Sequence, residues 1–496
     1  MSEENVQNTP EQKPEDIFAQ RAAKVQDLAA AGILPFGRRF DNVQMTADVR
    51  KNFKPEAEKQ EEVTIAGRMT AFRAMGKSIF ADIKDSSGRM QIYVQRDQIG
   101  EDDFKVFKKL DLGDIIGVTG EPFTTRTGEL TVKVHKFTLL SKSLRPLPEK
   151  FHGLTDIEQR YRQRYLDLIT NDDSRKVFMQ RFAILSEIRK FLASKGFLEV
   201  ETPMLQPIPG GANANPFKTF YEALNSPMYM RIAPELYLKR LLVGGFERVF
   251  ELNRNFRNEG IDRRHNPEFT MLEIYQAYGD CRSMMDLIEE MVTTIAMNLF
   301  GTLEIQHPGG KVINLARPWR RAPYRDLIKE RAGADWFELT KEQKAAKARE
   351  MGLTITTEME ERDITHEIYE KLIEQTLIQP TFVTRLPAYL VPLAKACEDD
   401  PTVVDVYELE INGQEISPGY SELNDPIEQR KRFVEQAVHD GKDLAMAIDE
   451  DFLTAMEHGM PPAGGLGLGV DRLIMLLTGA ESIRDVLLFP QMRLKQ

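Results

Sequence analysis

The sequence has 496 residues, 29% of them charged, and a formal net charge of −11 at pH 7. This length is enough for two or three domains with substantial cores, and the negative charge excludes a surface that is basic throughout, so any RNA must be bound by local patches and stacking. Two cysteines, Cys281 and Cys397, are too few for a disulfide framework and lack metal-ligand spacing, which favours a reducing compartment.

The chain opens with a polar segment and a helix. Residues 1–14 are rich in Glu, Gln and Pro, which predicts a disordered tail, and they hold no basic segment followed by an apolar core. Good helix formers run from Glu15 to Ala31 and end at Gly32, which predicts an amphipathic helix. No apolar run approaches the length of a membrane span, so we expect a cytoplasmic protein without a membrane partner.

Between residues 61 and 142, alternating segments predict five short strands. Five such strands are typical of an oligonucleotide-binding (OB) barrel, so residues 15–145 are predicted to form a helix and an OB-fold domain. These barrels stack bases on exposed aromatic rings beside polar side chains, which makes Phe80 and Gln91 candidate nucleotide contacts. The equal alternative is that Phe80 belongs to the barrel core.

A linker and a charged helix follow the barrel. Prolines and a glycine at 143–155 predict a domain boundary, and we assign 146–170 to the linker and the helix. The helix has three arginines that either touch RNA or form salt bridges, namely Arg160, Arg162 and Arg164.

Residues 171–496 are predicted to form a second domain. It begins with a helix at about 174–194 and a short strand that Pro203 ends. Gly210 and Gly211 follow in a flexible stretch where the backbone can approach a ligand closely.

Residues 248–275 read as two alternating strands joined by a charged loop. Alternation places Phe269, Glu273 and Tyr275 on one face, while Phe250 and Leu252 face the core. An arginine, carboxylates, a ring and a phenol on one face suit an anionic group, a flat base and a cation. The alternative is a polar hairpin at a domain surface.

The next segments are an insertion and an acidic hairpin. Residues 301–380 are rich in Lys, Glu and Ala and are expected to form a helical insertion. In 403–417, Asn412-Gly413 predicts a two-residue turn that sets Glu410 opposite Glu415 and makes Glu408 a diagonal neighbour of Glu415. Converging carboxylates repel one another unless a cation lies among them, so we interpret Glu408 and Glu415 as Mg²⁺ ligands. The role of Glu410 stays open, and an acidic edge in solvent is the alternative.

Near the end, GGLGLGVDRLIMLLTG at 464–479 places glycines before a helix that begins near Asp471. Backbone amides and a helix N-terminus in this arrangement can receive phosphate, although the Walker sequence and the dinucleotide fingerprint are absent. The alternative is a tight packing turn between a strand and a helix.

Several of these segments resemble the class II aminoacyl-tRNA synthetases. FRNEG followed by HNPEF resembles motif 2, GLGVDR resembles motif 3, and the helix, strand and Pro203 resemble motif 1, while RIAPELYLKRL is similar to the lysine-specific members. The resemblance covers about residue 15 to Pro490. It implies an α+β fold, an antiparallel sheet flanked by helices after an all-β OB-fold anticodon-binding barrel, and motif 1 implies a homodimer.

The resemblance also implies roles for individual residues. Arg257 would hold the α-phosphate of ATP and the lysine carboxylate, and Arg472 would neutralise the γ-phosphate, so these two are the candidate catalytic residues. The remaining implied ATP contacts are Glu259, His265, Asn266, Phe269 (stacked on adenine) and Glu408. The implied anticodon contacts are Phe80, Gln91 and Glu129.

Clustered glutamates indicate a cationic amino acid as the substrate. Glu235 would hold the α-ammonium of lysine, while Glu422, Glu273 and Tyr275 would bind the ε-ammonium, because a charge left unpaired in a closed pocket is costly. Gly211 and Tyr420 complete the lysine pocket that the resemblance implies.

We therefore expect a bacterial-type lysine–tRNA ligase that activates L-lysine with ATP and Mg²⁺ and charges tRNA(Lys). The alternatives are a paralogue that passes the aminoacyl group to a protein or small molecule, which the barrel argues against, and a non-catalytic tRNA-binding regulator, which the retained arginines and glutamates argue against. The chain departs from the family at Pro418, where lysine enzymes have Asn, and at Asn215, where they have a basic residue. Proline offers no polar side chain or backbone N–H, so we expect weaker lysine binding.

Overall fold

The computed structural model describes residues 14–148, 154, 156–391, 394–439 and 448–493. The chain divides into two compact units, Met1–Thr155 and Asp156–Gln496. The expected disordered tail lies outside the described residues except for Pro14, which begins the first helix. Part of the expected linker also lies outside them.

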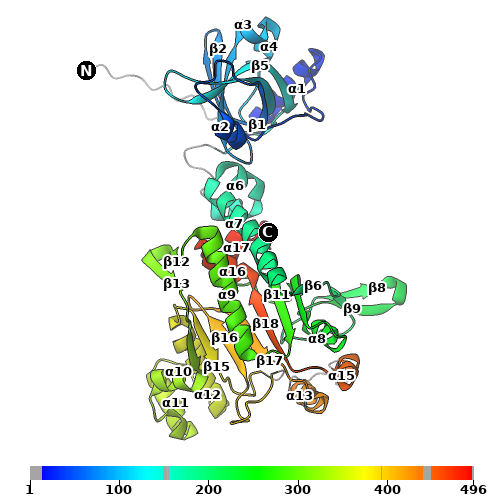
Figure 1. The fold of residues 1–496 in the computed structure, drawn as a ribbon, viewed down its shortest axis with the longest axis vertical. Helices are drawn as coiled ribbons and strands as arrows, with labels where there is room; N and C mark the ends of the chain where they lie inside the picture. Colours follow the sequence, from blue (N-terminus) through cyan, green and yellow to red (C-terminus); the bar gives the residue numbers. More distant parts are fainter. Residues whose placement is uncertain (1–13, 149–153, 155, 392–393, 440–447, 494–496) are drawn as a thin grey trace, which may run out of the picture. The chain divides into compact units, whose positions relative to one another are not determined.

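The first unit is built around a closed five-stranded barrel, as expected (Figure 1). The strands pair in the order β1-β2-β3-β5-β4 around a core of buried aliphatic side chains. They are β1 (Val63–Met75), β2 (Ser78–Lys84), β3 (Arg89–Gln95), β4 (Ile115–Thr124) and β5 (Leu130–Ser141). The helices of this unit are α1 (Pro14–Ala30), α2 (Thr46–Asn52), α3 (Arg96–Ile99) and α4 (Glu101–Phe107).

The second unit contains an eight-stranded sheet in the order β14-β15-β16-β17-β18-β11-β10-β6. Neighbouring strands are antiparallel except at the two edges, where β14 pairs with β15 and β10 pairs with β6 in parallel. Its strands are β6 (Leu198–Glu199), β10 (Arg248–Phe256), β11 (Glu268–Ala277), β14 (Arg320–Pro323), β15 (Thr381–Thr384), β16 (Val406–Glu410), β17 (Glu415–Ser421) and β18 (Ala463–Gly469). The expected antiparallel sheet flanked by helices is confirmed.

Helix α9 (Cys281–Phe300) covers one face of this sheet, packing on β17 and β18 (Figure 1). It begins at a capping box, in which the Asp280 carboxylate accepts from the Ser283 backbone N–H, and it ends at Gly301 in the left-handed region. Its buried side chains join the strands and α7 in the largest apolar core. The other helices of this sheet region are α7 (Asp172–Ser194), α8 (Glu235–Val243), α13 (Pro426–His439), α15 (Glu450–Glu457), α16 (Val470–Thr478) and α17 (Ile483–Val486).

A separate three-stranded sheet precedes α8 in the sequence. It pairs in the order β7-β9-β8, and its strands are β7 (Leu205–Gln206), β8 (Lys218–Tyr221) and β9 (Ser226–Met230).

The region 301–380 differs from the expected helical insertion. It contains α10 (Tyr324–Ala332), α11 (Lys341–Glu350) and α12 (Glu361–Ile368), which share a core around Trp336. It also contains the hairpin of β12 (Glu304–His307) and β13 (Lys311–Asn314) and contributes β14 to the main sheet. Composition favoured helix here, but it could not indicate that an edge strand completes the sheet.

The charged segment after residue 155 is two helices, α5 (Ile157–Arg162) and α6 (Arg164–Thr170), which break at Gln163. Asp167 accepts from Arg160 Nε at 2.8 Å and from Arg164 Nη1 at 2.6 Å. These arginines hold helices together, which favours the salt-bridge interpretation over RNA contact.

Candidate active site

The hairpin of β10 and β11 has the alternation that the sequence predicts. Glu251 lies opposite Glu273, and Asn255 lies opposite Phe269, so the polar face is continuous across both strands. Phe250 and Leu272 point to the other side, into the main core. The hairpin therefore presents its chemistry on one face of the sheet.

A pocket of about 230 Å³ lies where this hairpin meets α16 and the start of β17. Its lining includes six of the residues expected to contact ATP, together with the expected Mg²⁺ ligand Glu415; the six are Arg257, Glu259, His265, Asn266, Phe269 and Arg472. Glu408 does not line it. Arg264 and Pro418 do, and the sequence interpretation did not assign Arg264 to the nucleotide.

Two of the expected ATP contacts that line this pocket are arginines, and the first of them is Arg257. The Arg257 guanidinium lies over the Phe269 ring, 5.0 Å from its centroid, and its Nε is buried without a hydrogen-bond partner among the described residues. Burial lowers the pKa of Arg257, while Glu259 and Glu415 oppose that shift. A buried donor without an acceptor is costly, so this guanidinium is set to receive an anion.

The motif 3 arginine is held by its neighbours. Arg472 Nη1 donates to the Glu415 carbonyl oxygen at 2.6 Å, and its Nη2 lies 3.2 Å from His265 Nε2. The preceding Asp471 accepts from Arg181 Nη1 at 2.6 Å and from the Thr270 N–H at 2.8 Å. This buried pair fixes the start of α16 against the hairpin and so fixes where Arg472 points.

The acidic hairpin turns where the sequence predicts. Asn412 and Gly413 have φ of 60° and 69°, and Glu410 lies opposite Glu415. A bulge between Leu409 and Glu410 then places Pro418, rather than a residue one position earlier, opposite Glu408. A turn signal sets the register at the turn but does not reveal a bulge farther along the strands.

The carboxylates of this hairpin are crowded. Burial, followed by the charges of Glu415 and Glu374, raises the pKa of Glu408 to about 8 and that of Glu410 to about 10. Glu374 comes from the end of the 301–380 region and was missed by sequence reasoning. Among the described residues no three His, Cys, Asp or Glu side chains are arranged to hold a metal ion. Glu408 and Glu415 could together hold a cation whose remaining ligands are phosphate and water oxygens.

The expected lysine-pocket residues are close neighbours, but two of the glutamates already share a cation. Lys239 Nζ, with no exposed surface, lies 2.6 Å from Glu235 Oε1 and 2.6 Å from Glu422 Oε2. Burial would lower the pKa of Lys239, but the two carboxylates outweigh it and raise that pKa. The spacing of Glu235 and Lys239 on α8, four residues apart, is the sequence signal that could have revealed this pair.

One internal cation does not neutralise the pocket. Burial, then the charge of Glu235, raises the pKa of Glu273 to about 8, although the Tyr275 hydroxyl donates to Glu273 Oε2 at 3.1 Å. Glu422 Oε1 is buried with no hydrogen-bond partner in the described part of the chain. The pocket is therefore short of one cationic hydrogen-bond donor, and a ligand ammonium would supply it.

Glycines open space for this pocket, in a way that differs from the expected phosphate loop. Residues 463–469 form β18, and its alternate glycines Gly465 and Gly467 lie opposite Tyr275 and Glu273. A Cβ on Gly465 would come 1.9 Å from Glu422 Oε1. Gly211, with φ of +83°, also lies close to a pocket side chain, since a Cβ there would come 2.9 Å from Glu235 Cβ.

The chain is similar to known protein families over most of its length. Residues 156–493 match the family described as tRNA synthetases class II (D, K and N), and residues 63–140 match the OB-fold nucleic acid binding domain. The chain belongs to the class II tRNA synthetases of this group. A lysine–tRNA ligase of Carboxydothermus hydrogenoformans is 52% identical over 485 residues, covering 97% of this chain and 99% of the relative. A lysine–tRNA ligase of Staphylococcus aureus is 51% identical over 490 residues, covering 97% and 99%.

In this synthetase the barrel carries the candidate anticodon residues on one surface. Phe80 is half-buried and outside the barrel core, and its ring lies 4.5 Å from that of Tyr93, which is 6.2 Å from Phe123. Gln91 Oε1 accepts from the Thr131 hydroxyl at 2.9 Å. The rings of Tyr93 and Phe123 were missed in the sequence, where only Phe80 was singled out.

Glu129 and the two departures from the family also have defined surroundings. Glu129 Oε1 lies 3.3 Å from Arg89 Nη2. Pro418 lines the nucleotide pocket, and the backbone of Asn215 accepts from the Asn258 N–H at 2.7 Å. Both departures thus lie at the synthetase site. No described helix is long and apolar enough to cross a membrane.

Proposed function

We propose that the chain is a lysine–tRNA ligase acting on L-lysine, ATP and tRNA(Lys). The lysine carboxylate attacks the α-phosphorus of ATP, the bond between the α-phosphorus and the bridging oxygen breaks, and pyrophosphate leaves. A terminal ribose hydroxyl of tRNA then attacks the lysyl carbonyl carbon, and AMP leaves with the electron pair. Neither step needs a covalent bond to the protein.

The residues of the nucleotide pocket supply orientation and charge. Arg257 meets the α-phosphate and the lysine carboxylate, and Arg472 meets the γ-phosphate of an ATP whose adenine stacks at Phe269. Glu259, His265 and Asn266 complete the nucleotide contacts. Fixed cationic donors of this kind lower the barrier because they need no reorganisation as charge moves during the reaction. Mg²⁺ bound through Glu408 and Glu415 would add neutralisation of the phosphates.

The observation that carries the lysine assignment is the charge balance of the pocket. Glu235 and Glu422 share one internal ammonium, that of Lys239, whereas Glu273 has no such partner, and burial with the charge of Glu235 raises its pKa to about 8. An acidic or neutral amino acid would leave Glu273 without a cationic partner. Tyr275, Tyr420 and Gly211 shape the remaining walls.

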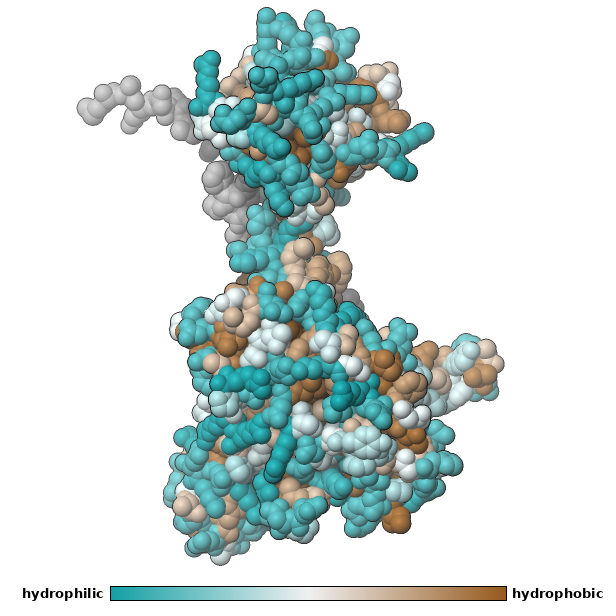
Figure 2. Space-filling view, viewed as in Figure 1, coloured by the Kyte–Doolittle hydropathy of each residue, from teal (hydrophilic) through white to brown (hydrophobic). Residues whose placement is uncertain are grey.

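Apolar surface supports a homodimer through motif 1. Met179 and Phe182 on α7 and Leu198 on the edge strand β6 are about half exposed, at 56%, 48% and 52%. Figure 2 shows apolar side chains gathered on the side of this unit that carries β6, β8 and β9. An edge strand flanked by apolar side chains is a surface that a second copy can cover.

Pyrophosphate exchange into ATP, run with each of the twenty amino acids, tests the proposal. We expect lysine alone to support exchange, only with Mg²⁺, and tRNA(Lys) to be charged in a second assay. Exchange without tRNA charging would instead point to a paralogue with another acceptor. Tight tRNA binding without exchange would point to a regulator.

A further inference from the structure

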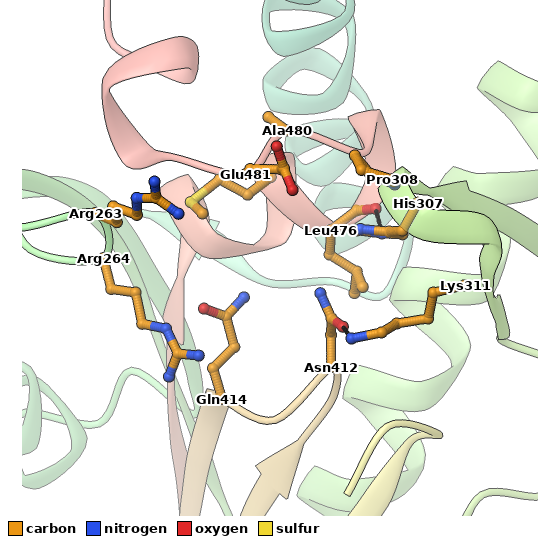
Figure 3. Close-up of a pocket in the computed structure, with 11 residues that line it drawn as sticks. Arg263, Arg264, His307, Pro308, Lys311, Asn412, Gln414, Leu476, Ala480 and Glu481 are labelled. Carbon is orange, nitrogen blue, oxygen red and sulfur yellow. Dashed lines mark hydrogen bonds between the residues drawn. The ribbon is translucent and has the colours of Figure 1, made fainter. Parts of the chain in front are cut away.

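A second pocket, of about 250 Å³, lies beside the nucleotide pocket (Figure 3). Its walls come from the loop between β10 and β11, the β12–β13 hairpin, the turn between β16 and β17, and the segment after α16. Arg264 lines both pockets, and its Nη1 donates to the Gly413 carbonyl oxygen at 3.2 Å. The two pockets are therefore neighbours that share one guanidinium.

The charged side chains around this second pocket are mostly cationic. Arg263, Arg264 and Lys311 line it, against one carboxylate, that of Glu481. Lys311 Nζ bonds only a neutral group here, Asn412 Oδ1 at 2.8 Å, and within residues 14–148, 154, 156–391, 394–439 and 448–493 no ion pair involves Arg263 or Lys311. The charged side chains that line this pocket therefore carry a net positive charge.

A side-chain amide adds a directed donor. Gln414 is only 6% exposed, and Figure 3 shows its side-chain amide pointing into the space between Arg264 and Lys311. Within the described residues no side-chain hydrogen bond involves this amide, and its polar atoms stay open to the pocket. Its N–H groups can therefore donate to an anion bound there.

We propose that this pocket binds inorganic pyrophosphate or an oligophosphate of similar size. Guanidinium groups match phosphate oxygens in geometry, and an ammonium and an amide N–H add further donors. The two guanidinium groups come from the loop between β10 and β11 and the ammonium comes from β13, so cations on separate elements surround the pocket, which favours an anion with more than one phosphate group. This inference rests on the proposed function in one respect, namely that pyrophosphate is released in the neighbouring nucleotide pocket. Arg264 lines both pockets and can contact the anion in either one.

Calorimetry on the full chain tests the site with the nucleotide pocket already filled. The enzyme is saturated with lysine, Mg²⁺ and a non-hydrolysable ATP analogue, whose own binding is measured first, and is then titrated with pyrophosphate. We expect one pyrophosphate per chain, bound roughly tenfold more weakly by Lys311→Met and by Arg263→Met, a loss of about 1.4 kcal/mol each. Glu481→Gln is the matched control and should bind more tightly, because it removes the one negative side chain. The exposed positions of Arg263 and Lys311 leave the fold intact, which thermal unfolding verifies.

Two outcomes would overturn the proposal. One is the absence of pyrophosphate binding to the saturated enzyme, and the other is binding that neither cationic substitution changes. Titration with orthophosphate separates an oligophosphate site from a general anion site, since equal affinity for orthophosphate would overturn the assignment of an anion with more than one phosphate group. If pyrophosphate binding obeys these predictions while lysine-dependent exchange is absent, the proposed function fails and the anion site stands. Product inhibition of tRNA charging adds a kinetic measure. The part of the pyrophosphate inhibition that excess ATP does not relieve should be weaker in Lys311→Met than in the unmodified enzyme. Unchanged inhibition would argue against occupation of this pocket by the product.

Discussion

Lysine binding should depend on pH through Glu273. Its pKa of about 8 means that the empty pocket keeps this carboxyl protonated at neutral pH, and a bound ammonium must displace the proton. Affinity therefore rises as pH increases toward 8 and is lost as pH falls. A carboxyl with this pKa is ionised to roughly 3% at pH 6.5 and roughly 75% at pH 8.5, so lysine should bind roughly twentyfold more tightly at the higher pH, about 1.8 kcal/mol.

The groups that face Glu273 allow sharp controls. They are Tyr275 on its own strand, Glu251 across the hairpin, Glu235 on α8 and Arg257. Calorimetric titration of lysine without ATP, in steps from pH 6.5 to 8.5, measures the dependence. Glu273→Gln should remove the step near pH 8 and leave the step at lower pH that comes from Glu422, whose pKa burial raises to about 7. Tyr275→Phe removes a hydrogen bond that lowers the pKa of Glu273 and should move the midpoint to higher pH. A flat profile in the unmodified enzyme, or an unchanged profile in Glu273→Gln, would refute the assignment of the ε-ammonium to this carboxylate.

Four further substitutions test the rest of the site. Lys239→Met leaves two buried carboxylates without their cation and should cost ~3–5 kcal/mol in urea unfolding, while a loss under 1 kcal/mol would contradict a buried pair. Gly465→Ala should abolish lysine binding but keep ATP binding, because its Cβ meets Glu422; calorimetry with each ligand decides. Phe80→Ala should weaken tRNA charging by ~1–3 kcal/mol and leave pyrophosphate exchange unchanged, so equal loss in both assays without unfolding would argue against an anticodon contact. Pro418→Asn should lower the lysine KM roughly two- to tenfold with little change in the KM for ATP, since one hydrogen bond is worth ~0.5–1.5 kcal/mol, and an unchanged lysine KM would remove Pro418 from the specificity argument.

Local signals predicted the elements that carry the chemistry. The alternation at 248–275 and the Asn412-Gly413 turn each specify a hairpin. The first hairpin has the predicted polar face, and the second has the predicted pairing of Glu410 with Glu415 beside its turn. Helix α9 is another element whose signals lie within its own sequence, since its 20 residues run from a capping residue to a terminal glycine.

Features that depend on distant parts of the chain could not be predicted in this way. Glu374 reaches the acidic hairpin from the 301–380 region, and β14 joins the sheet edge from the same region. The bulge at Leu409 and the pairing of Lys239 with Glu422, 183 positions later in the chain, are likewise set by tertiary packing. Composition and periodicity describe what a segment can form, whereas these contacts depend on which segment lies next to it.

The sequence GLGLG at 465–469 shows how a pattern can be present and yet be assigned to the wrong structure. Glycines before a helix suggested a loop for phosphate, but strict alternation of Gly and Leu is also the pattern of a strand with one apolar face and one face without side chains. Leu466 and Leu468 enter the core, while the glycine face lies across from Tyr275 and Glu273. Because a strand normally gains stability by packing side chains on both faces, an empty face in the centre of a sheet implies that something else must fill it. In this chain the Glu422 carboxylate and the Tyr275 ring fill the space over Gly465, 1.9 Å and 2.7 Å from where a Cβ would lie, so the glycine face is what admits these two side chains.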